Sequence, residues 1–114
     1  DAHGLVQVHG RAGDLIISGG ENVWPEPVEA VLRTHPDVAD AGVLGVDDPE
    51  WGQAVTAVVV PFDPSMPPSL DALRAHVKDN LPAFHAPHRL VLVDELPRTT
   101  LGKLRRGELR MLLP

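Results

Sequence analysis

The chain has 114 residues with ordinary apolar (43%) and charged (23%) fractions, which fits one folded domain with a modest core and argues against disorder. It has no cysteine, which excludes disulfides, thiolate nucleophiles and zinc–thiolate sites and is compatible with the cytoplasm, where we expect the protein to act. The net charge is −6 and the aromatic content only 4%, so nucleic-acid binding is not expected.

The N-terminal end of the chain shows no targeting signal. No signal peptide begins it, and no apolar run in the chain approaches the length of a membrane span. The first residue is aspartate rather than methionine, and we therefore interpret the chain as a piece of a longer protein.

A short β-hairpin is predicted near this end. Leu5–Val8 alternates apolar and polar residues, Leu15–Ile17 is a β-branched run, and glycines punctuate the interval between them. Arg11 lies in the turn, where its side chain could project toward a ligand or pair with Asp14. The residues alone leave both alternatives open.

Two adjacent glycines, Gly19 and Gly20, follow this hairpin. Such a pair can be a simple turn, or it can let a narrow substrate pass close to the backbone. A helix is predicted over Pro25–Thr34, because proline suits the first turn and Val28 and Leu32 lie on one face.

Two apolar, β-branched segments, Val38–Val46 and Ala54–Phe62, predict strands that pair around an acidic loop. The loop lacks the regular ligand spacing and the closing glutamate of a calcium loop. The six histidines of the chain form no His-x-x-x-His pair and stand beside no matching carboxylate cluster. We therefore predict no metal site.

The remaining elements are two more helices and a third strand. Ser69 caps a helix whose apolar stripe runs to Leu81, Leu90–Val93 predicts a buried strand, and Arg106–Leu113 predicts a last helix. The predicted architecture is α+β, with a short N-terminal β-hairpin followed by a three-stranded sheet packed with about three helices.

The segment Pro97–Arg106, PRTTLGKLRR, carries the most specific signal. A proline and two threonines interrupt regular structure, and Gly102 permits a tight turn before Lys103. A Walker phosphate loop is excluded, because Leu104 stands where Ser or Thr is needed and no glycine lies five residues before Gly102. From Pro97 onward the chain holds half of its 10 Lys and Arg residues, which fits a small anionic ligand better than a polyanion.

This segment, together with GRAGDLIISGGENVWP at residues 10–25, resembles a known family. Both motifs have the order and spacing of the C-terminal domain of the AMP-forming acyl-CoA synthetases, adenylate-forming enzymes that include peptide-synthetase adenylation domains and beetle luciferases. The resemblance covers nearly the whole chain. It implies a hairpin and hinge region over residues 1–18 and a lid domain over residues 19–114, with a large N-terminal adenylating domain as the partner in the same polypeptide.

The resemblance implies two half-reactions. A carboxylic acid first reacts with ATP to give an acyl-adenylate and pyrophosphate, and the acyl group then passes to coenzyme A or another thiol. Lys103 matches the adenylation lysine of the family, whose charge offsets the repulsion between carboxylate and α-phosphate. Arg11 matches an arginine that approaches the nucleotide phosphate. Mg²⁺ is expected to accompany ATP in the full enzyme without being bound by this domain.

The second half-reaction implies other residues. Gly20, with Ser18 and Gly19 beside it, would lie along the pantetheine tunnel of coenzyme A. Because one small domain cannot present both loops to one ligand at once, the family rotates the whole domain about a hinge. The hinge position corresponds to Gly13, where the family commonly has Asp or Lys, and Asp14 could take over the lost contact.

The acyl substrate is only weakly indicated. The run ISGGEN is more similar to fatty-acyl or aryl-CoA ligases, including the succinylbenzoate type of menaquinone synthesis, than to peptide-synthetase domains. The competing hypothesis is a free-standing anion-binding or protein-interaction module. An upstream reading frame of roughly four hundred residues with a Ser/Thr/Gly-rich loop would favour the ligase, and a start codon just before residue 1 would favour the module.

Overall fold

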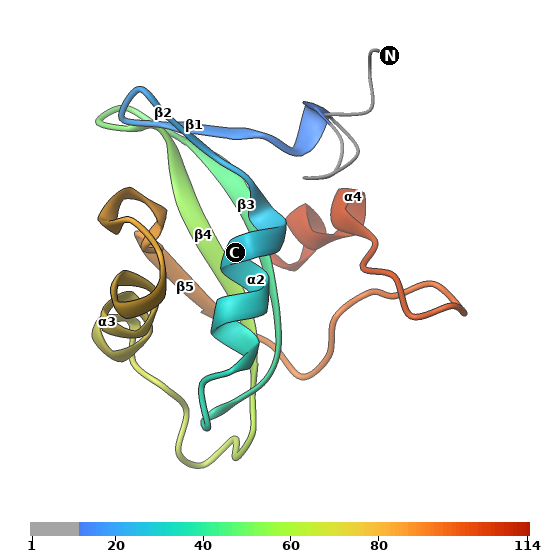
Figure 1. Cartoon of the computed structure of the whole chain (residues 1–114). Helices are drawn as coiled ribbons and strands as arrows, with labels where there is room; N and C mark the ends of the chain where they lie inside the picture. The colour runs from blue at the N-terminus through green and yellow to red at the C-terminus, as the bar shows by residue number, and fades with distance from the viewer. Residues whose placement is uncertain (1–11) are drawn as a thin grey trace.

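The computed structural model describes residues 12–114, so the predicted strand Leu5–Val8 and the predicted ligand residue Arg11 lie outside the described part. This part contains a two-stranded hairpin, a three-stranded sheet and three α-helices (Figure 1). The predicted α+β architecture is confirmed.

β1 (Ile16–Ser18) and β2 (Glu21–Val23) form the antiparallel hairpin. Gly19 and Gly20 make its two-residue turn, with φ angles of 59° and 83° that favour glycine. β1 matches the second strand of the predicted hairpin, but its partner within the described residues is β2, which was not predicted. The segment of β2 has no alternating or β-branched run, and it pairs because the glycine turn reverses the chain at once.

The larger sheet has the strand order β3–β4–β5. β3 (Val38–Asp48) pairs antiparallel with β4 (Gly52–Pro61) around the acidic turn, as predicted, and β5 (Arg89–Leu92) pairs parallel with β4. The parallel pairing requires a crossover, which α3 (Leu70–Asn80) supplies. Because β4 is the central strand, its residues 54–59 are buried on both faces, which explains their nearly unbroken apolar run.

α2 (Pro25–Arg33) and α3 cover one face of this sheet (Figure 1). Pro25 occupies the first turn of α2, and the Ser69 side chain caps α3 by accepting the N–H of Ala72 at 3.0 Å. The β1–β2 hairpin closes one end of the same core. Its fully buried members include Ile16, Val23, Val28, Leu32, Val43, Val55, Val59, Leu73 and Val77.

The C-terminal segment covers the opposite face. α4 (Arg106–Leu109) and the 3₁₀ turn η3 (Arg110–Leu112) place Leu109 against the sheet, where it is fully buried. Gly42 of β3 permits this approach, because a Cβ there would lie 3.0 Å from the Leu109 side chain. The predicted single helix Arg106–Leu113 is therefore one helical turn followed by a 3₁₀ turn, since a glycine near its start lowers its helix propensity.

The longest helix of the described part, α3, has 11 residues. Between residues 12 and 114, no helix combines the length and the apolar character needed to cross a bilayer.

Candidate functional site

Residues 99–103 form a tight loop, here called the lysine loop. The N–H of Thr99 donates to the carbonyl oxygen of Lys103 at 2.8 Å, and the N–H of Gly102 donates to that of Thr99 at 2.9 Å. Gly102 has a φ of 87°, in the region that favours glycine, so the chain reverses immediately before the lysine. This is the tight turn that the sequence predicted.

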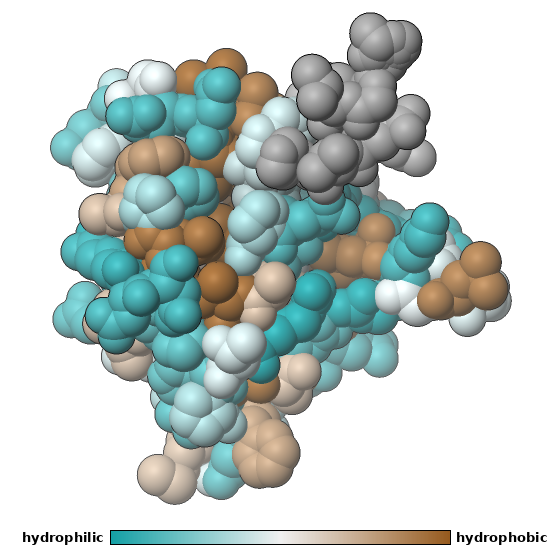
Figure 2. Space-filling model, viewed as in Figure 1, coloured by the Kyte–Doolittle hydropathy of each residue, from teal (hydrophilic) through white to brown (hydrophobic). Residues whose placement is uncertain are grey.

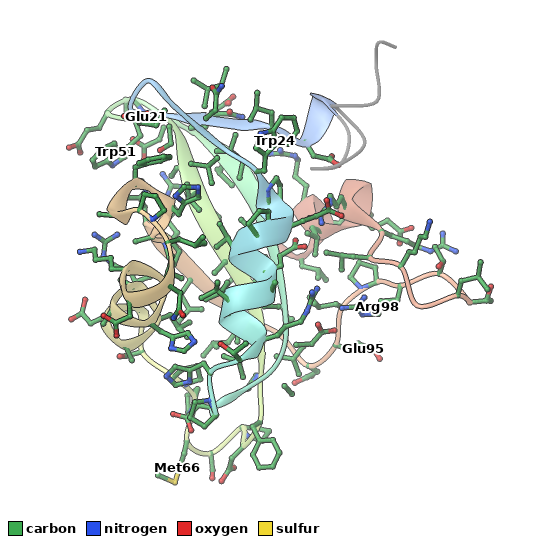
Figure 3. All side chains as sticks on the ribbon, viewed as in Figure 1. Glu21, Trp24, Trp51, Met66, Glu95 and Arg98 are labelled. Carbon is green, nitrogen blue, oxygen red and sulfur yellow. The ribbon has the colours of Figure 1, made fainter. Side chains whose placement is uncertain are left out.

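The tip of the lysine loop stands clear of the body of the domain. Lys103 is exposed, and Leu101, two residues earlier, is 88% exposed. Figure 2 shows the tip as a projecting lobe, and Figure 3 places Arg98 at the base of this lobe. An ammonium group on such a tip can reach a ligand that another part of a larger protein holds.

Arg98 ties the base of the loop to β3. Its guanidinium donates from Nε and Nη2 to Oδ2 of Asp40 at 3.0 and 2.8 Å, and Nη2 lies 2.6 Å from Oδ1. Its Nη1 donates to the carbonyl oxygen of Gly102 at 2.7 Å. Arg33 of α2 also donates to Oδ1 of Asp40, at 3.1 Å. One carboxylate thus joins the loop, β3 and α2.

The charge of Asp40 is stabilised by these contacts. Burial alone would raise the pKa of Asp40, but hydrogen bonds from Arg98, the Ala41 N–H and Arg33 outweigh burial and lower this pKa below its usual value. The carboxylate therefore stays ionised, and the brace stays intact, at neutral pH.

A second ion pair lies where the chain leaves the loop. Arg106, the first residue of α4, pairs through two nitrogens with Glu29 of α2, and its Nε lies 3.6 Å from Oδ2 of Asp14. Glu29 is only 2% exposed and also accepts the N–H of Val43 at 2.8 Å. Burial alone would lower the pKa of Arg106, but the hydrogen bond and the charge of Glu29 raise it above its usual value. The Arg106 guanidinium therefore stays charged.

An open groove of about 840 Å³ lies beside the lysine loop. Its charged lining residues are Asp14, Glu26, Glu29, Arg33, Arg98, Lys103, Arg105 and Arg106. Each of the four arginines forms an ion pair with a carboxylate. Lys103 has no carboxylate within salt-bridge distance among residues 12–114, so its charge is not neutralised by these side chains.

The Gly19–Gly20 turn packs on the turn between β3 and β4. The N–H of Gly19 donates to the carbonyl oxygen of Trp51 at 2.9 Å, and a Cβ on Gly19 would lie 3.2 Å from the Trp51 ring. Trp51 stacks on His88 with ring centroids 4.3 Å apart. Figure 3 places Glu21 and Trp51 together at this end of the molecule. Gly19 thus packs on Trp51 on one side, and the backbone of Gly19 and Gly20 is exposed on the other.

His88 supports this stack as a neutral side chain. Burial lowers the pKa of His88, and the charge of Arg74 lowers it further. Its Nδ1 accepts the N–H of Val55 at 3.3 Å, which requires that this nitrogen carries no proton.

Ser18, a predicted coenzyme A residue, faces the core and not the surface of the turn. It is 4% exposed, and its Oγ has no hydrogen-bond partner among the described residues. Gly19 and Gly20 are exposed. A ligand that passes over the turn would therefore meet the glycine backbone, and it would reach the Ser18 hydroxyl only after a local shift.

The lysine loop and the Gly19–Gly20 turn lie at opposite sides of the molecule (Figure 1). The predicted hinge residues have different surroundings. Gly13 is exposed, with no heavy atom within 4 Å of a Cβ placed on it, whereas Asp14 contacts Arg106. No group of three or more His, Cys, Asp or Glu side chains between residues 12 and 114 is arranged to hold a metal ion.

Three residues that support the lysine loop, Glu29, Asp40 and Arg98, carried no predicted role. Glu29 did carry a signal, because a carboxylate next to Val28 on the apolar face of a helix indicates a buried ion pair. Asp40 likewise interrupts an apolar strand. Their arginine partners lie 77 and 58 residues away in the sequence, so only the tertiary structure could identify them.

Comparison with known proteins decides the family. The sequence model of the AMP-binding enzyme C-terminal domain matches residues 27–103, a range that ends at the lysine of the loop. The chain belongs to this family. The family expected from the sequence is thereby confirmed.

A curated relative and two solved structures support this assignment. The chain is 48% identical over 114 residues to 2-succinylbenzoate–CoA ligase of Geobacillus kaustophilus (strain HTA426), covering 100% of the chain and 23% of that protein. o-Succinylbenzoate CoA synthetase (MenE) from Bacillus subtilis, in complex with its acyl-adenylate intermediate, has a TM-score of 0.77 and 42% identity, covering 88% of this chain and 20% of that one. A fatty acyl CoA synthetase of Mycobacterium tuberculosis has a TM-score of 0.80 and 31% identity, covering 90% of this chain and 20% of that chain.

The chain therefore spans less than a quarter of the length of each of these three proteins.

Proposed function

We propose that this chain is the mobile C-terminal lid of an ATP-dependent, AMP-forming acyl- or aryl-CoA ligase. The observation that carries the proposal is the exposed Lys103 on a loop whose base is braced by two ion pairs. Family membership and the identity to a 2-succinylbenzoate–CoA ligase support it. A large N-terminal domain of the same polypeptide would hold ATP and the acid.

The first half-reaction joins a carboxylate oxygen to the α-phosphorus of ATP and releases pyrophosphate. Both reactants are anions, so they repel one another as they approach. An ammonium group that contacts both offsets this repulsion and stabilises the charge of the transition state without losing its proton. Lys103 suits this role because it is exposed and has no carboxylate partner among residues 12–114.

Magnesium is assigned to the large domain. The described residues offer no carboxylate cluster that fits Mg²⁺, so the ion that accompanies ATP would be held with the nucleotide by other residues. Arg11, which lies outside the described residues, stays a prediction as a contact to the nucleotide phosphate.

The second half-reaction, transfer of the acyl group to the thiol of coenzyme A, is assigned to the opposite end of the domain. The exposed backbone of Gly19 and Gly20 would line the path of the narrow pantetheine arm. Because this turn and the lysine loop lie apart (Figure 1), the domain would exchange them by rotating about Gly13 and Asp14. Ser18 stays a prediction as a coenzyme A contact.

Lys103→Ala in the full-length ligase tests the proposal. We expect adenylate formation to slow by about two to three powers of ten, because one preorganised donor to the transition state is lost. Thioester formation from supplied acyl-adenylate should stay within about twofold of wild type, since this step does not use the lysine. Lys103→Arg, which retains the charge, should slow adenylate formation less than Lys103→Ala does. Equal loss of both half-reactions in a folded Lys103→Ala variant would contradict the assignment.

The acid is proposed to be 2-succinylbenzoate or a fatty acid, in line with the three similar proteins. Pyrophosphate release by the full-length enzyme, measured with each acid, would show which has the higher kcat/KM. A stand-alone anion-binding module would release none with any acid.

A further inference from the structure

Arg98 is placed to set the shape of the lysine loop. Its Nη1 donates at 2.7 Å to the carbonyl oxygen of Gly102, which belongs to the peptide that precedes Lys103. The neck of the loop is closed by an isolated β-bridge between Arg98 and Leu104. The direction in which Lys103 leaves the loop therefore depends on where the Arg98 guanidinium is held.

Asp40 holds that guanidinium. It makes three contacts of 2.6 to 3.0 Å with Nε and Nη2 of Arg98, the two-pronged geometry that gives arginine–carboxylate pairs their directionality. The pairing of β3 with β4 also shifts register here, from Val38 opposite Pro61 to Asp40 opposite Val60. Irregularities of this kind re-aim a side chain away from the regular strand direction.

Asp40 contacts arginines from both α2 and the base of the lysine loop, but the loop depends on it more than α2 does. Arg33 also contacts Asp40, but it keeps the carbonyl oxygen of Ala41 at 2.9 Å as a further acceptor. The other acceptor of Arg98 among the described residues is the carbonyl oxygen of Gly102, inside the loop itself. Loss of the Asp40 charge would thus leave Arg33 anchored and release Arg98 together with the loop.

We propose that Asp40 is a positioning residue for the adenylation half-reaction, because it fixes, through Arg98, the orientation of the peptide ahead of Lys103. The inference rests on the proposed function of Lys103. Asp40 itself touches no reactant. Its effect is geometric, and displacement of a reacting group by about 1 Å can cost about 100-fold in rate.

Asp40→Asn in the full-length ligase tests this role, since it removes the charge and keeps the size of the side chain. Adenylate formation in a single turnover should slow by about 10- to 100-fold. Thioester formation from supplied acyl-adenylate should stay within about twofold of wild type. Asp40→Glu should recover part of the lost rate. A wild-type adenylation rate, or equal slowing of both half-reactions, would overturn the proposal.

Glu108→Gln is the matched control. It removes one negative charge from an exposed pair with Arg105 at 3.2 Å, close to the loop, and leaves the contacts of Arg98 intact. Both half-reactions should keep their wild-type rates. If this variant slows adenylation as much as Asp40→Asn does, the effect comes from net charge and the positioning role is refuted.

Arg98→Lys examines the other partner of the pair. It retains the charge, but a lysine cannot donate to the Asp40 carboxylate and to the Gly102 carbonyl in the geometry of the guanidinium. Adenylation should slow as in Asp40→Asn, and the double variant should be no slower than either single one. Additive losses would show that the two residues act independently and would overturn the proposal.

Amide hydrogen exchange of the full-length ligase separates this inference from the proposed function. The loop amides of Thr99, Gly102 and Lys103 are hydrogen-bonded within the loop, and in Asp40→Asn they should exchange faster than in wild type or Glu108→Gln. Unchanged exchange would refute the positioning role, whatever Lys103 does. Normal adenylation by Lys103→Ala would instead refute the proposed function.

Discussion

The lysine loop and the Gly19–Gly20 turn are held in opposite ways. Charged pairs, Arg98 with Asp40 and Arg106 with Glu29, anchor the base of the lysine loop and leave its tip exposed. The glycine turn is anchored at Gly19, by a backbone hydrogen bond to Trp51 and by close packing on the Trp51 ring. The difference fits the proposed roles, in which the lysine tip enters a site on another domain and a narrow molecule passes over the glycine backbone.

The lysine loop and the Gly19–Gly20 turn share one support, β3 and the turn that follows it. β3 supplies Asp40 near its beginning, and the turn after its end supplies Trp51. A movement of the sheet as a body would carry both loops together, because the same strand holds both. The proposed rotation, which would exchange the two ends of the domain, requires that they move together.

The largest effect on stability is expected at the buried anchor of the lysine loop. Glu29→Gln removes the charge that pairs with Arg106 and should destabilise the 114-residue chain by about 2–3 kcal/mol, because Arg106 is left without its buried counter-charge. Urea unfolding measures this. Asp79→Asn, at an exposed acid of α3, serves as the control and should change little. Equal effects would show that the anchor contributes no more than a surface charge.

A smaller effect is expected at the glycine turn. Gly19→Ala should cost about 1–2 kcal/mol for its left-handed backbone and more for the contact with Trp51. Gly20→Ala shares the backbone penalty but has open space for its methyl group, so it should cost less. The difference between the two unfolding free energies isolates the packing on Trp51. If Gly20→Ala is the more damaging, the turn is not seated on that ring.

The partly exposed ion pair between Asp40 and Arg98 should make the free energy of unfolding weakly dependent on pH. Because the pKa of Asp40 is lowered on folding, its contribution is present above the ordinary aspartate pKa and is lost as pH falls through the folded value. After allowance for solvent screening, the contribution is about 0.5–1 kcal/mol. Wild type should thus exceed Asp40→Asn in unfolding free energy at pH 7, and the gap should close in acid. A gap that widens in acid would contradict the sign.

The smallest effect is expected at the tip of the lysine loop. Leu101→Ser should change the unfolding free energy by less than about 0.5 kcal/mol, because the side chain is 88% exposed and contributes little to the fold. Thermal unfolding at matched concentration measures this. A loss comparable to that of Gly19→Ala would show that the tip packs on the domain in solution, and it would weaken the contrast between the two regions.

Local patterns predicted most of the fold. β-branched runs marked β3 and β4, and a capping serine marked the start of α3, because these signals depend only on neighbouring residues. β2 was not predicted, because its segment has no strand pattern and pairs only through the glycine turn. The C-terminal helix was predicted too long, because the apolar pattern did not take account of the glycine near its start, which lowers its helix propensity.

Like the fold, the candidate site has residues that local patterns could predict and residues that they could not. Lys103 and Gly19–Gly20 could be singled out from motifs, since a glycine before a lysine and a glycine pair after a strand are short-range features. Asp40 and Glu29 could not be joined to their arginines, because the partners lie 58 and 77 residues apart. That Ser18 points inward could not be predicted either, because that depends on which face of β1 the core covers.

By itself, the sequence determined the α+β class, the identity of the presented lysine and the family, because composition, periodicity and short motifs carry that information. The tertiary structure alone decided which carboxylates brace the loop, which ring supports the glycines, and that the two ends of the domain are separate. The physical reason is that ion pairs and packing contacts form between residues brought together by the sheet, and no local pattern encodes that proximity.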